Sequence, residues 1–593
     1  MTTSLTLGHS ILSMPTRDSK HVAVKFKVGN SWTEKSWQEY FQDIERVGAA
    51  LLSLGIKPGD RIAIMANTRY EWSVTDYAIF GIKAITVPIY QNNTAEDVEY
   101  ILNNCKARFL ICESRGPLKT YESVKEKCSF VEKVIVFEDN SPNAEVITWD
   151  KVQSMGNAYL RQHPNCYKEP CATLKPNDTA TILYTSGTTG RPKGVVLTHL
   201  QAFSEVSEAF PFAGADTNDV SLSFLPYAHI LGRIEHWGHL YIGFTMAYAE
   251  SLEKVRGNLT DIRPTILVSV PRIFEKIYAA IWAQIQTQPL KMKLFTWALG
   301  VGKTVGEYKM SGQILPLDLL AKYEIAKKLV LNKITDAFGG RLRFAISGGA
   351  PISKDIALFF HSAGILVLEG YGLTESTAAI TVNTPFNYRF GSVGRPIGEV
   401  KIRIAEDGEI MVKSDKIMRE YYENPEATKE VFTDGWFHTG DIGEILPSGD
   451  LRITDRKKDL IKTAGGKYVA PQRLENLLKL CPYISNVLIH GDQKKYIVAL
   501  LFLDRPTVEN LAREKHVKFE GWNDLVKSSF VQDLMRQAIA DANSQLASYE
   551  SIKKYYVMPN ELTIEAGELT PSLKVKRKVL DKKFTSQIEE LYA

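Results

Sequence analysis

The stretch Tyr184-Thr-Ser-Gly-Thr-Thr-Gly-Arg-Pro-Lys-Gly-Val-Val-Leu-Thr-His199 decides how the rest of this chain is interpreted. It joins an apolar, strand-like segment (180–184) to a helix-like segment (200–210) through hydroxyls, glycines and Lys193. Glycines let a backbone turn tightly and bring its N–H groups close to an anion, while hydroxyls add donors and the lysine adds charge. The stretch therefore favours a polyphosphate-binding loop. A plain polar surface loop has the same composition, so this interpretation needs support from elsewhere in the chain.

The stretch is not a Walker loop. That loop requires a glycine, four further residues and then Gly-Lys followed by Ser or Thr. Counting from Gly187, the fifth residue on is Pro192, and Lys193 precedes a glycine instead of following one. The sequence therefore argues against a P-loop nucleotidase.

Five further motifs follow along the chain. They are Ser347-Gly-Gly-Ala-Pro351, Glu369-Gly-Tyr-Gly-Leu-Thr-Glu-Ser376, Gly435-Trp-Phe-His-Thr-Gly-Asp441, Asp455-Arg-Lys-Lys-Asp-Leu-Ile-Lys462 and Leu569-Thr-Pro-Ser-Leu-Lys-Val-Lys-Arg577. In this order, they and the first stretch resemble the AMP-binding signature of the adenylate-forming enzymes. That superfamily contains acyl-CoA synthetases, luciferases and peptide-synthetase adenylation domains, and the resemblance covers most of the chain.

Length and composition set the frame. The 593 residues are too many for one hydrophobic core, and 44% hydrophobic with 24% charged residues is typical of a globular protein. The net charge of +4 is too small to argue for nucleic acid; it is compatible with an anionic membrane surface, and equally with a neutral cytosolic enzyme. Six cysteines without a C-x-x-C pair predict reduced thiols. The N-terminus does not match a secretory signal, so we expect a cytoplasmic protein, with peripheral contact on the inner membrane face left open.

Strand-like and helix-like segments alternate over hundreds of residues, which predicts a doubly wound α/β architecture. A capping-box pattern at 36–39 opens a helix that Gly55 ends, and apolar runs predict strands at 61–65, 84–89, 109–112, 134–137, 180–184 and 266–270. Short alternating strands over 400–451 predict a small β subdomain. We expect residues 1–457 to form the AMP-binding domain and 458–593 a small, mobile α+β C-terminal domain.

The resemblance implies a nucleotide site and assigns roles within it. Thr185 to Thr189 and Lys193 would wrap the phosphates, Thr374 would bond the α-phosphate, and Glu375 would hold Mg²⁺ with the Thr185 hydroxyl. Asp441 would accept both ribose hydroxyls, and Arg456 would donate to one of them. The full set implied to bind ATP or AMP is Thr185, Ser186, Gly187, Thr188, Thr189, Lys193, Gly349, Ala350, Gly370, Tyr371, Gly372, Leu373, Thr374, Asp441, Arg456 and Lys574.

The resemblance also marks Lys574, with Thr374 and Glu375, as catalytic. Many relatives carry Ser-Gly-Lys where this chain has Ser572-Leu-Lys574, so Lys576 is the alternative register. By the same resemblance Lys458 is the hinge between the domains, and Gly465 and Gly466 line the path of CoA.

His229 is implied to stand between the ATP site and the acyl tunnel. A histidine buried beside a strand end fits the same sequence, so both interpretations stay open. Arg233 occupies the spacing at which some thermophile relatives carry a tunnel-gating tryptophan, so no gate is expected there.

Segments 225–229, 268–275, 463–471 and the lysine-rich region 283–334 resemble the long-chain branch of the superfamily. The resemblance therefore implies a long-chain fatty acid–CoA ligase that uses ATP, Mg²⁺ and CoA and forms an acyl-adenylate. The alternatives are a fatty acyl-AMP ligase, an aryl or medium-chain CoA ligase, and a catalytically silent nucleotide- or lipid-binding relative. Nucleic acid is not expected as a partner; peripheral membrane contact and a homodimer are left open.

Overall fold

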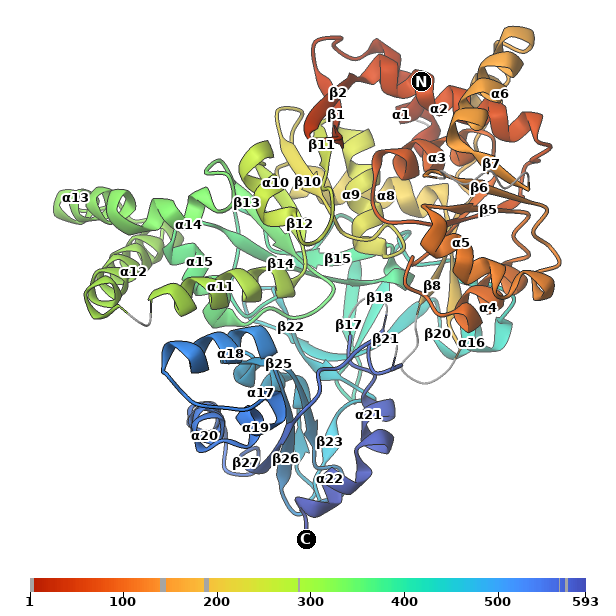
Figure 1. Cartoon of the computed structure of the whole chain (residues 1–593). Coiled ribbons are helices and arrows are strands. Elements are labelled where there is room, and N and C mark those ends of the chain that lie inside the picture. The colour runs from red at the N-terminus through yellow and green to blue at the C-terminus, as the bar shows by residue number, and fades with distance from the viewer. Residues whose placement is uncertain (1–4, 139–144, 186–190, 286–287, 565, 571–573) are drawn as a thin grey trace.

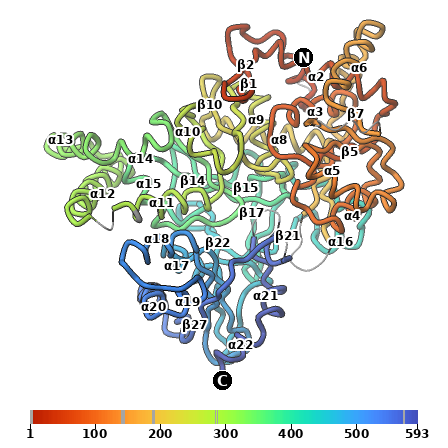
Figure 2. Tube along the Cα trace, in the orientation of Figure 1, coloured from red at the N-terminus to blue at the C-terminus, as the bar shows by residue number. Residues whose placement is uncertain are grey.

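The structure is a computed structural model that describes residues 5–138, 145–185, 191–285, 288–564, 566–570 and 574–593. A large N-terminal part, built of several sheets and their helices, lies above a smaller C-terminal domain (Figure 1). The trace in Figure 2 shows this C-terminal domain in blue, with the C-terminus at its far end. The expected α/β class is confirmed.

An eight-stranded sheet, in the order β19-β9-β8-β4-β3-β5-β6-β7, carries the first stretch. Its strands are β3 (Arg61–Met65), β4 (Ile85–Ile89), β5 (Phe109–Cys112), β6 (Lys133–Val136), β7 (Val146–Thr148), β8 (Thr179–Thr185), β9 (Lys193–Thr198) and β19 (Glu420–Tyr421). Strands β3 to β8 pair in parallel, whereas β9 and β19 pair antiparallel. Parallel strands are buried on both faces, which explains why β3 and β5 are continuous apolar runs.

Helices cover this sheet. They include α2 (Trp37–Ser53), α3 (Tyr70–Gly81), α4 (Ala95–Cys105), α5 (Arg115–Glu122) and α6 (Trp149–Gln162). Helix α2 begins with the expected capping box between Ser36 and Glu39, and Gly55 follows it at φ +94°, a conformation suited to glycine. The helix predicted from the sequence is thus confirmed, and the predicted strands are displaced by a residue or two at most.

Two further sheets, β10-β11-β1-β2 and β12-β13-β14-β15-β16, form the rest of the α/β part. Their strands are β1 (Val22–Val28), β2 (Ser31–Ser36), β10 (Val220–Ser223), β11 (Thr245–Tyr248), β12 (Ile266–Ser269), β13 (Phe344–Ser347), β14 (Val367–Leu373), β15 (Ala378–Val382) and β16 (Arg395–Pro396). The associated helices are α8 (His199–Phe212), α9 (Ile230–Ile242), α10 (Val255–Ile262), α11 (Pro271–Ile285), α12 (Pro289–Met310), α13 (Leu317–Ala326), α14 (Asn332–Asp336) and α15 (Lys354–Ser362). Thr265 joins the two sheets, because its N–H donates to the carbonyl of Val220.

The predicted β subdomain is present. It contains β17 (Lys401–Ile404), β18 (Glu409–Lys413), β20 (Phe432–Thr433), β21 (Trp436–Ile445) and β22 (Leu451–Arg456). The C-terminal domain is built on β25 (Ile484–His490), β26 (Ile497–Leu503) and β27 (Ile552–Met558), with α17 (Pro471–Leu478), α18 (Arg505–Glu514), α20 (Ser529–Asn543), α21 (Arg577–Lys583) and α22 (Thr585–Glu590) around them. The buried residues of the main N-terminal core end at Leu451, and those of the C-terminal core begin at Ile461.

A fully buried ion pair ties α9 to α3. Arg233 and Asp76 are both inaccessible to solvent, and the Arg233 guanidinium lies 3.0 Å from Asp76 Oδ1. The same guanidinium faces the rings of Trp72 and Trp237, each at 4.9 Å. Burial opposes the charged form of Asp76, but the charge of Arg233 together with the contacts of His236 and Thr86 lowers the pKa of the carboxyl. Arg233 therefore anchors α9 in the core, which agrees with the expectation that it is no gate.

Replacing Asp76 with Ala should lower the free energy of unfolding by about 3–5 kcal/mol, because it leaves a buried guanidinium without its counterion. Denaturant unfolding followed by tryptophan fluorescence measures the loss. Asp318→Ala, which removes the exposed partner of Lys322, is the matched control and should change stability by less than about 1 kcal/mol. Equal losses in both variants would contradict the assigned role of the buried pair.

Candidate functional site

Three strands bring Tyr371, Asp441 and Arg456 together. The Tyr371 hydroxyl on β14 donates to Asp441 Oδ2 at 2.7 Å, and Arg456 Nε lies 3.1 Å from Asp441 Oδ1. Asp441 and Arg456 are direct partners in the antiparallel pairing of β21 and β22, so this contact follows from the strand register. Burial raises the pKa of Asp441, and the charge of Arg456 opposes that rise. The result is an oriented carboxylate at the floor of the site.

A second cluster joins Glu375, Tyr421 and Lys193. Glu375 lies in the short 3₁₀ turn Thr374–Ser376 that directly follows β14. Its Oε1 accepts a 2.7 Å hydrogen bond from the Tyr421 hydroxyl, while Lys193 Nζ stands 4.8 Å from the centre of the Tyr421 ring. Tyr421 thus links the two charged residues that the sequence predicted separately.

Sequence reasoning did not find Tyr421. Its position depends on the pairing of β19 with β9, in which Tyr421 faces Val195 across the sheet. No motif around Tyr421 carries recognisable chemistry, so only that long-range pairing could have pointed to it.

The first stretch is held at both of its ends. Thr185 is the last residue of β8, Lys193 is the first residue of β9, and the two are cross-strand partners. The Thr185 hydroxyl also donates a hydrogen bond to the Lys193 carbonyl at 3.4 Å. Ser186, Gly187, Thr188 and Thr189 lie outside the described residues. The structure therefore places the ends of the expected phosphate loop next to the Tyr421 cluster.

The backbone of β14 tolerates nothing larger than glycine at one predicted position. A Cβ on Gly372 would come within 1.3 Å of the Ala378 carbonyl oxygen on the neighbouring strand β15. At Gly370 the closest approach would be 3.3 Å, to Val382. Gly372 thus lets β15 pack tightly against the segment that delivers Leu373 and Thr374 to the site.

His229 lies beside Gly349. A Cβ on Gly349, which has φ +80°, would be 3.8 Å from His229 Cε1, and both Gly349 and Ala350 are exposed. His229 also caps α9, because its Nδ1 accepts the N–H of Leu231 at 3.2 Å. Burial, aided by the nearby charge of Lys574, lowers the pKa of His229 to about 3. The ring is therefore neutral, and with Nδ1 as acceptor its proton sits on Nε2.

Lys574 reaches this site from the C-terminal domain. Its charge interacts with those of Arg456, Asp441 and Glu375. Desolvation by the surrounding protein, reinforced by Arg456, lowers the pKa of Lys574 to about 8, although Lys574 itself is exposed. Lys576 instead precedes α21, where its N–H donates to the carbonyl of Glu568.

Three predicted residues lie away from this cluster. Lys458 is exposed in the turn after β22. Gly465 and Gly466 are exposed in the turn between β23 (Ile461–Lys462) and β24 (Tyr468–Val469), and a Cβ on Gly466 would meet nothing within 4 Å. In this arrangement, no described contact joins them to Asp441 or Lys574.

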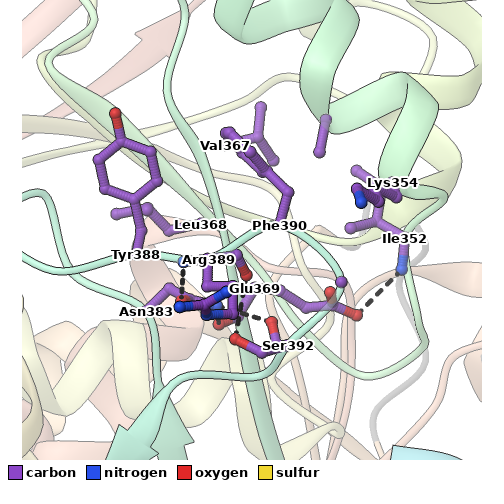
Figure 3. A pocket seen from close by; sticks show the side chains of 12 residues that line it. Ile352, Lys354, Val367, Leu368, Glu369, Asn383, Tyr388, Arg389, Phe390 and Ser392 are labelled. Atoms are coloured by element: carbon purple, nitrogen blue, oxygen red, sulfur yellow. Dashed lines mark hydrogen bonds between the residues drawn. The ribbon is translucent and has the colours of Figure 1, made fainter. Parts of the chain in front are cut away.

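A small pocket lies where the 347–352 loop meets β14 (Figure 3). Glu369 points toward the loop, and its carboxyl accepts a hydrogen bond from the N–H of Ile352 at 3.2 Å. On the other side, the Asn383 amide donates to the carbonyl of Ser392. Burial raises the pKa of Glu369 to about 8, so this acid is protonated over much of the neutral range. The pocket adjoins Gly370 and Tyr371, which the sequence assigned to the nucleotide site.

Solved structures with the same fold were found. An adenylation domain of a carboxylate reductase from Mycobacterium chelonae matches with a TM-score of 0.76 and 23% identity, covering 99% of this chain and 91% of that one. An anthranilate CoA ligase, solved with anthranoyl-AMP, matches with a TM-score of 0.75 and 18% identity, covering 98% of each chain. The fold is therefore that of the adenylate-forming enzymes.

The family follows from sequence. The AMP-binding enzyme family matches residues 14–422 and its C-terminal domain matches residues 458–593, so the chain belongs to this family. Among curated relatives, the long-chain-fatty-acid–CoA ligase FadD15 of Mycobacterium bovis is 35% identical over 97% of this chain and 95% of its own length. The peroxisomal long chain acyl-CoA synthetase 7 of Arabidopsis thaliana is 31% identical over 97% of this chain and 84% of its own.

Proposed function

We propose that this chain is a long-chain fatty acid–CoA ligase that forms an acyl-adenylate from fatty acid and ATP and then an acyl-CoA. One observation carries the proposal: Lys574 of one domain meets Glu375, Asp441 and Arg456 of the other. The relatives named as long-chain ligases over nearly the whole chain support the substrate class. We place the domain division between residues 457 and 458.

In the first half-reaction, a carboxylate oxygen of the fatty acid attacks the α-phosphorus of ATP, and the bond to pyrophosphate breaks. We assign Asp441 and Arg456 to the ribose, Thr374 to the α-phosphate, and Gly349, Ala350 and Tyr371 to adenine. Thr185 and Lys193 hold the phosphate loop at its ends. The ammonium of Lys574 stabilises the negative charge that develops on the carboxylate and phosphate oxygens.

Mg²⁺ fits this site through Glu375. Among the described residues no three acidic, histidine or cysteine side chains gather into a metal cage. Mg²⁺ bound to nucleotides takes one or two protein oxygens and otherwise phosphates and water, so a single oriented carboxylate with the Thr185 hydroxyl suffices. When bound, the ion neutralises phosphate charge; Tyr421 fixes the carboxylate that would hold it.

In the second half-reaction, the thiol sulfur of CoA attacks the acyl carbonyl and AMP leaves. The protected site around Lys574 must open to admit the thiol. We propose that the C-terminal domain rotates about Lys458, which takes Lys574 away and brings Gly465 and Gly466 to line the path of the pantetheine. His229, neutral and beside Gly349, would stand between the nucleotide and the acyl chain.

Two finer expectations are also proposals. One is peripheral contact with a membrane surface; no helix in the described part of the chain has the length and apolar character to cross a bilayer. The other is a homodimer, which light scattering on the purified chain would measure.

The substrate class is tested with a panel of carboxylic acids, from acetate through arachidate to aromatic acids, scored by pyrophosphate release. Long-chain acids should give the highest kcat/KM, and AMP release should require CoA. Adenylate that accumulates whether or not CoA is present would favour a fatty acyl-AMP ligase. Highest turnover with short or aromatic acids would favour the other ligases, and absence of pyrophosphate with every acid would favour the silent relative.

The two half-reactions should be separable. Lys574→Ala should slow acyl-adenylate formation by about 10²–10³-fold, because it removes one charged donor from the developing charge, while supplied acyl-adenylate still reacts with CoA. Lys458→Pro, which fixes φ, should leave adenylate formation intact and block transfer to CoA. Lys576→Ala removes one lysine charge from the same segment and is the control; it should leave both half-reactions near the wild-type rate. Proportional loss of both half-reactions in both variants would contradict the rotation.

Adenylation should depend on pH through Lys574. Its pKa is lowered to about 8 and its charged form exists below that pKa, so kcat/KM for ATP should fall as pH rises through about 8. ATP–pyrophosphate exchange isolates this step from the ionisation of the CoA thiol. Lys574→Arg, whose guanidinium stays charged, should be slower but lose this alkaline fall. An unchanged fall in that variant would assign the ionisation to another group.

Tyr421→Phe should raise the half-saturating Mg²⁺ concentration by roughly tenfold, because it removes one hydrogen bond to a charged group that orients Glu375. The ring that faces Lys193 remains, so the affinity for ATP at saturating Mg²⁺ should change little. Tyr422→Phe is the neighbouring control. A Mg²⁺ titration that leaves both variants at the wild-type value would remove Tyr421 from the metal site.

A further inference from the structure

Helices α12 and α13 form a hairpin that projects sideways from the N-terminal part (Figures 1 and 2). Of the nineteen exposed large hydrophobic side chains among the described residues, nine lie between residues 290 and 329. They are Leu290, Leu294, Trp297, Met310, Ile314, Leu317, Leu320, Ile325 and Leu329. Ile314 and Leu317 are 93% and 84% exposed and lie where the chain turns from α12 into α13.

Helix α13 is apolar on two sides. On its inner side Ala326 is buried, and the Tyr323 hydroxyl lies 3.5 Å from the position that a Cβ would take at Gly364. On its other side Leu317, Leu320 and Ile325 face solvent. Asp318, Lys322 and Glu324 are the charged residues of this helix. Exposed apolar side chains gathered beside them mark a candidate docking surface.

Positive charge surrounds these apolar side chains. Residues 289–333 contain eight lysines and three acidic residues, a net charge of +5, whereas the whole chain has +4. Among the described residues, only Lys322 and Lys327 of these eight form ion pairs, with Asp318 and Glu324. The segment 289–333 therefore carries the chain's net positive charge, since subtracting its +5 from the +4 of the whole chain leaves −1 for the remaining residues.

The hairpin is connected to the candidate active site through α11. Val270, the residue before α11, lies 3.9 Å from the position of a Cβ on Gly349, and at the other end Trp282 packs against Phe295 of α12 with ring centres 5.3 Å apart. A helix of this length spans about 22 Å. The base of the hairpin, at Phe295, thus lies about one helix length from the site, and the tip lies at the far end of α12.

We propose that the α12–α13 hairpin docks on an anionic lipid bilayer, with Ile314 and Leu317 entering the headgroup region and the unpaired lysines facing the lipid phosphates. Exposed apolar side chains at the tip and lysines along the adjoining helices match the two components of peripheral membrane binding. An apolar protein partner would not require the excess positive charge. Docking would bring the enzyme to a water-insoluble fatty acid, and this benefit rests on the proposed function. The binding to the bilayer does not rest on it.

The test is co-sedimentation of the full chain with vesicles, without substrates. Vesicles of equal parts phosphatidylcholine and phosphatidylglycerol should bind the chain, and pure phosphatidylcholine should bind it at least about tenfold more weakly. Ile314→Glu/Leu317→Glu and Lys303→Glu/Lys328→Glu should each weaken binding at least about tenfold. Val28→Glu, at a side chain 61% exposed on β1, is the matched control and should bind like the wild type.

Wild-type binding that both hairpin variants retain would overturn the proposal, as would absence of binding to either vesicle. Circular dichroism and thermal unfolding confirm that the variants are folded. Adenylation of octanoate, which dissolves in water, should be unchanged in the hairpin variants, whereas use of palmitate offered in anionic vesicles should fall. If the wild type binds vesicles but activates no fatty acid, the proposed function fails and the docking surface stands.

Discussion

The site depends on how two positive charges, Lys574 and Arg456, are offset by two carboxylates, Asp441 and Glu375. Lys574 from the C-terminal domain stands close to Arg456, a like charge, and Asp441 and Glu375 offset the repulsion. The pKa of Lys574 is lowered because burial and the charge of Arg456 disfavour the ammonium more than the two carboxylates favour it. An anion between the two cations would lower their repulsion further. The proposed domain rotation would therefore be coupled to the charge of the bound nucleotide, since phosphate between Lys574 and Arg456 offsets their repulsion.

Buried charge also fixes the scaffold beneath this site. The pair of Arg233 and Asp76 joins α9 to α3, and Lys416 contacts Glu205 and Glu208 of α8. Glu205 in turn accepts the N–H of Ala379 on β15, next to the strand that carries Tyr371. Such pairs contribute little net stability compared with apolar residues, but removing one partner is costly. They therefore hold α9 on α3, and α8 on Lys416 and β15, in one arrangement.

The sequence predicted those parts of the fold and site that depend on local order. Apolar runs predicted β3 and β5 because a parallel strand is buried on both faces. The resemblance implied that Asp441 and Arg456 bind the ribose and that Lys574 reaches the carboxylate and phosphate oxygens. The sequence did not predict Tyr421, whose place depends on a two-residue strand that pairs far along the chain. It also did not predict the partner of Arg233, because nothing in the α3 sequence marks Asp76 as a buried counterion. Contacts between distant segments are set by packing, which a single sequence does not display.

The same limit applies to charge. A net charge of +4 on 593 residues argues for no particular partner. The structure shows that the excess is local, since residues 289–333, which include α12 and α13, have a net charge of +5 and also carry nine of the exposed apolar side chains. Electrostatic attraction between exposed charges fades beyond about 10 Å at moderate salt, so a partner senses the hairpin and not the average. Local charge next to exposed apolar surface is therefore the quantity that determines what this chain can dock on.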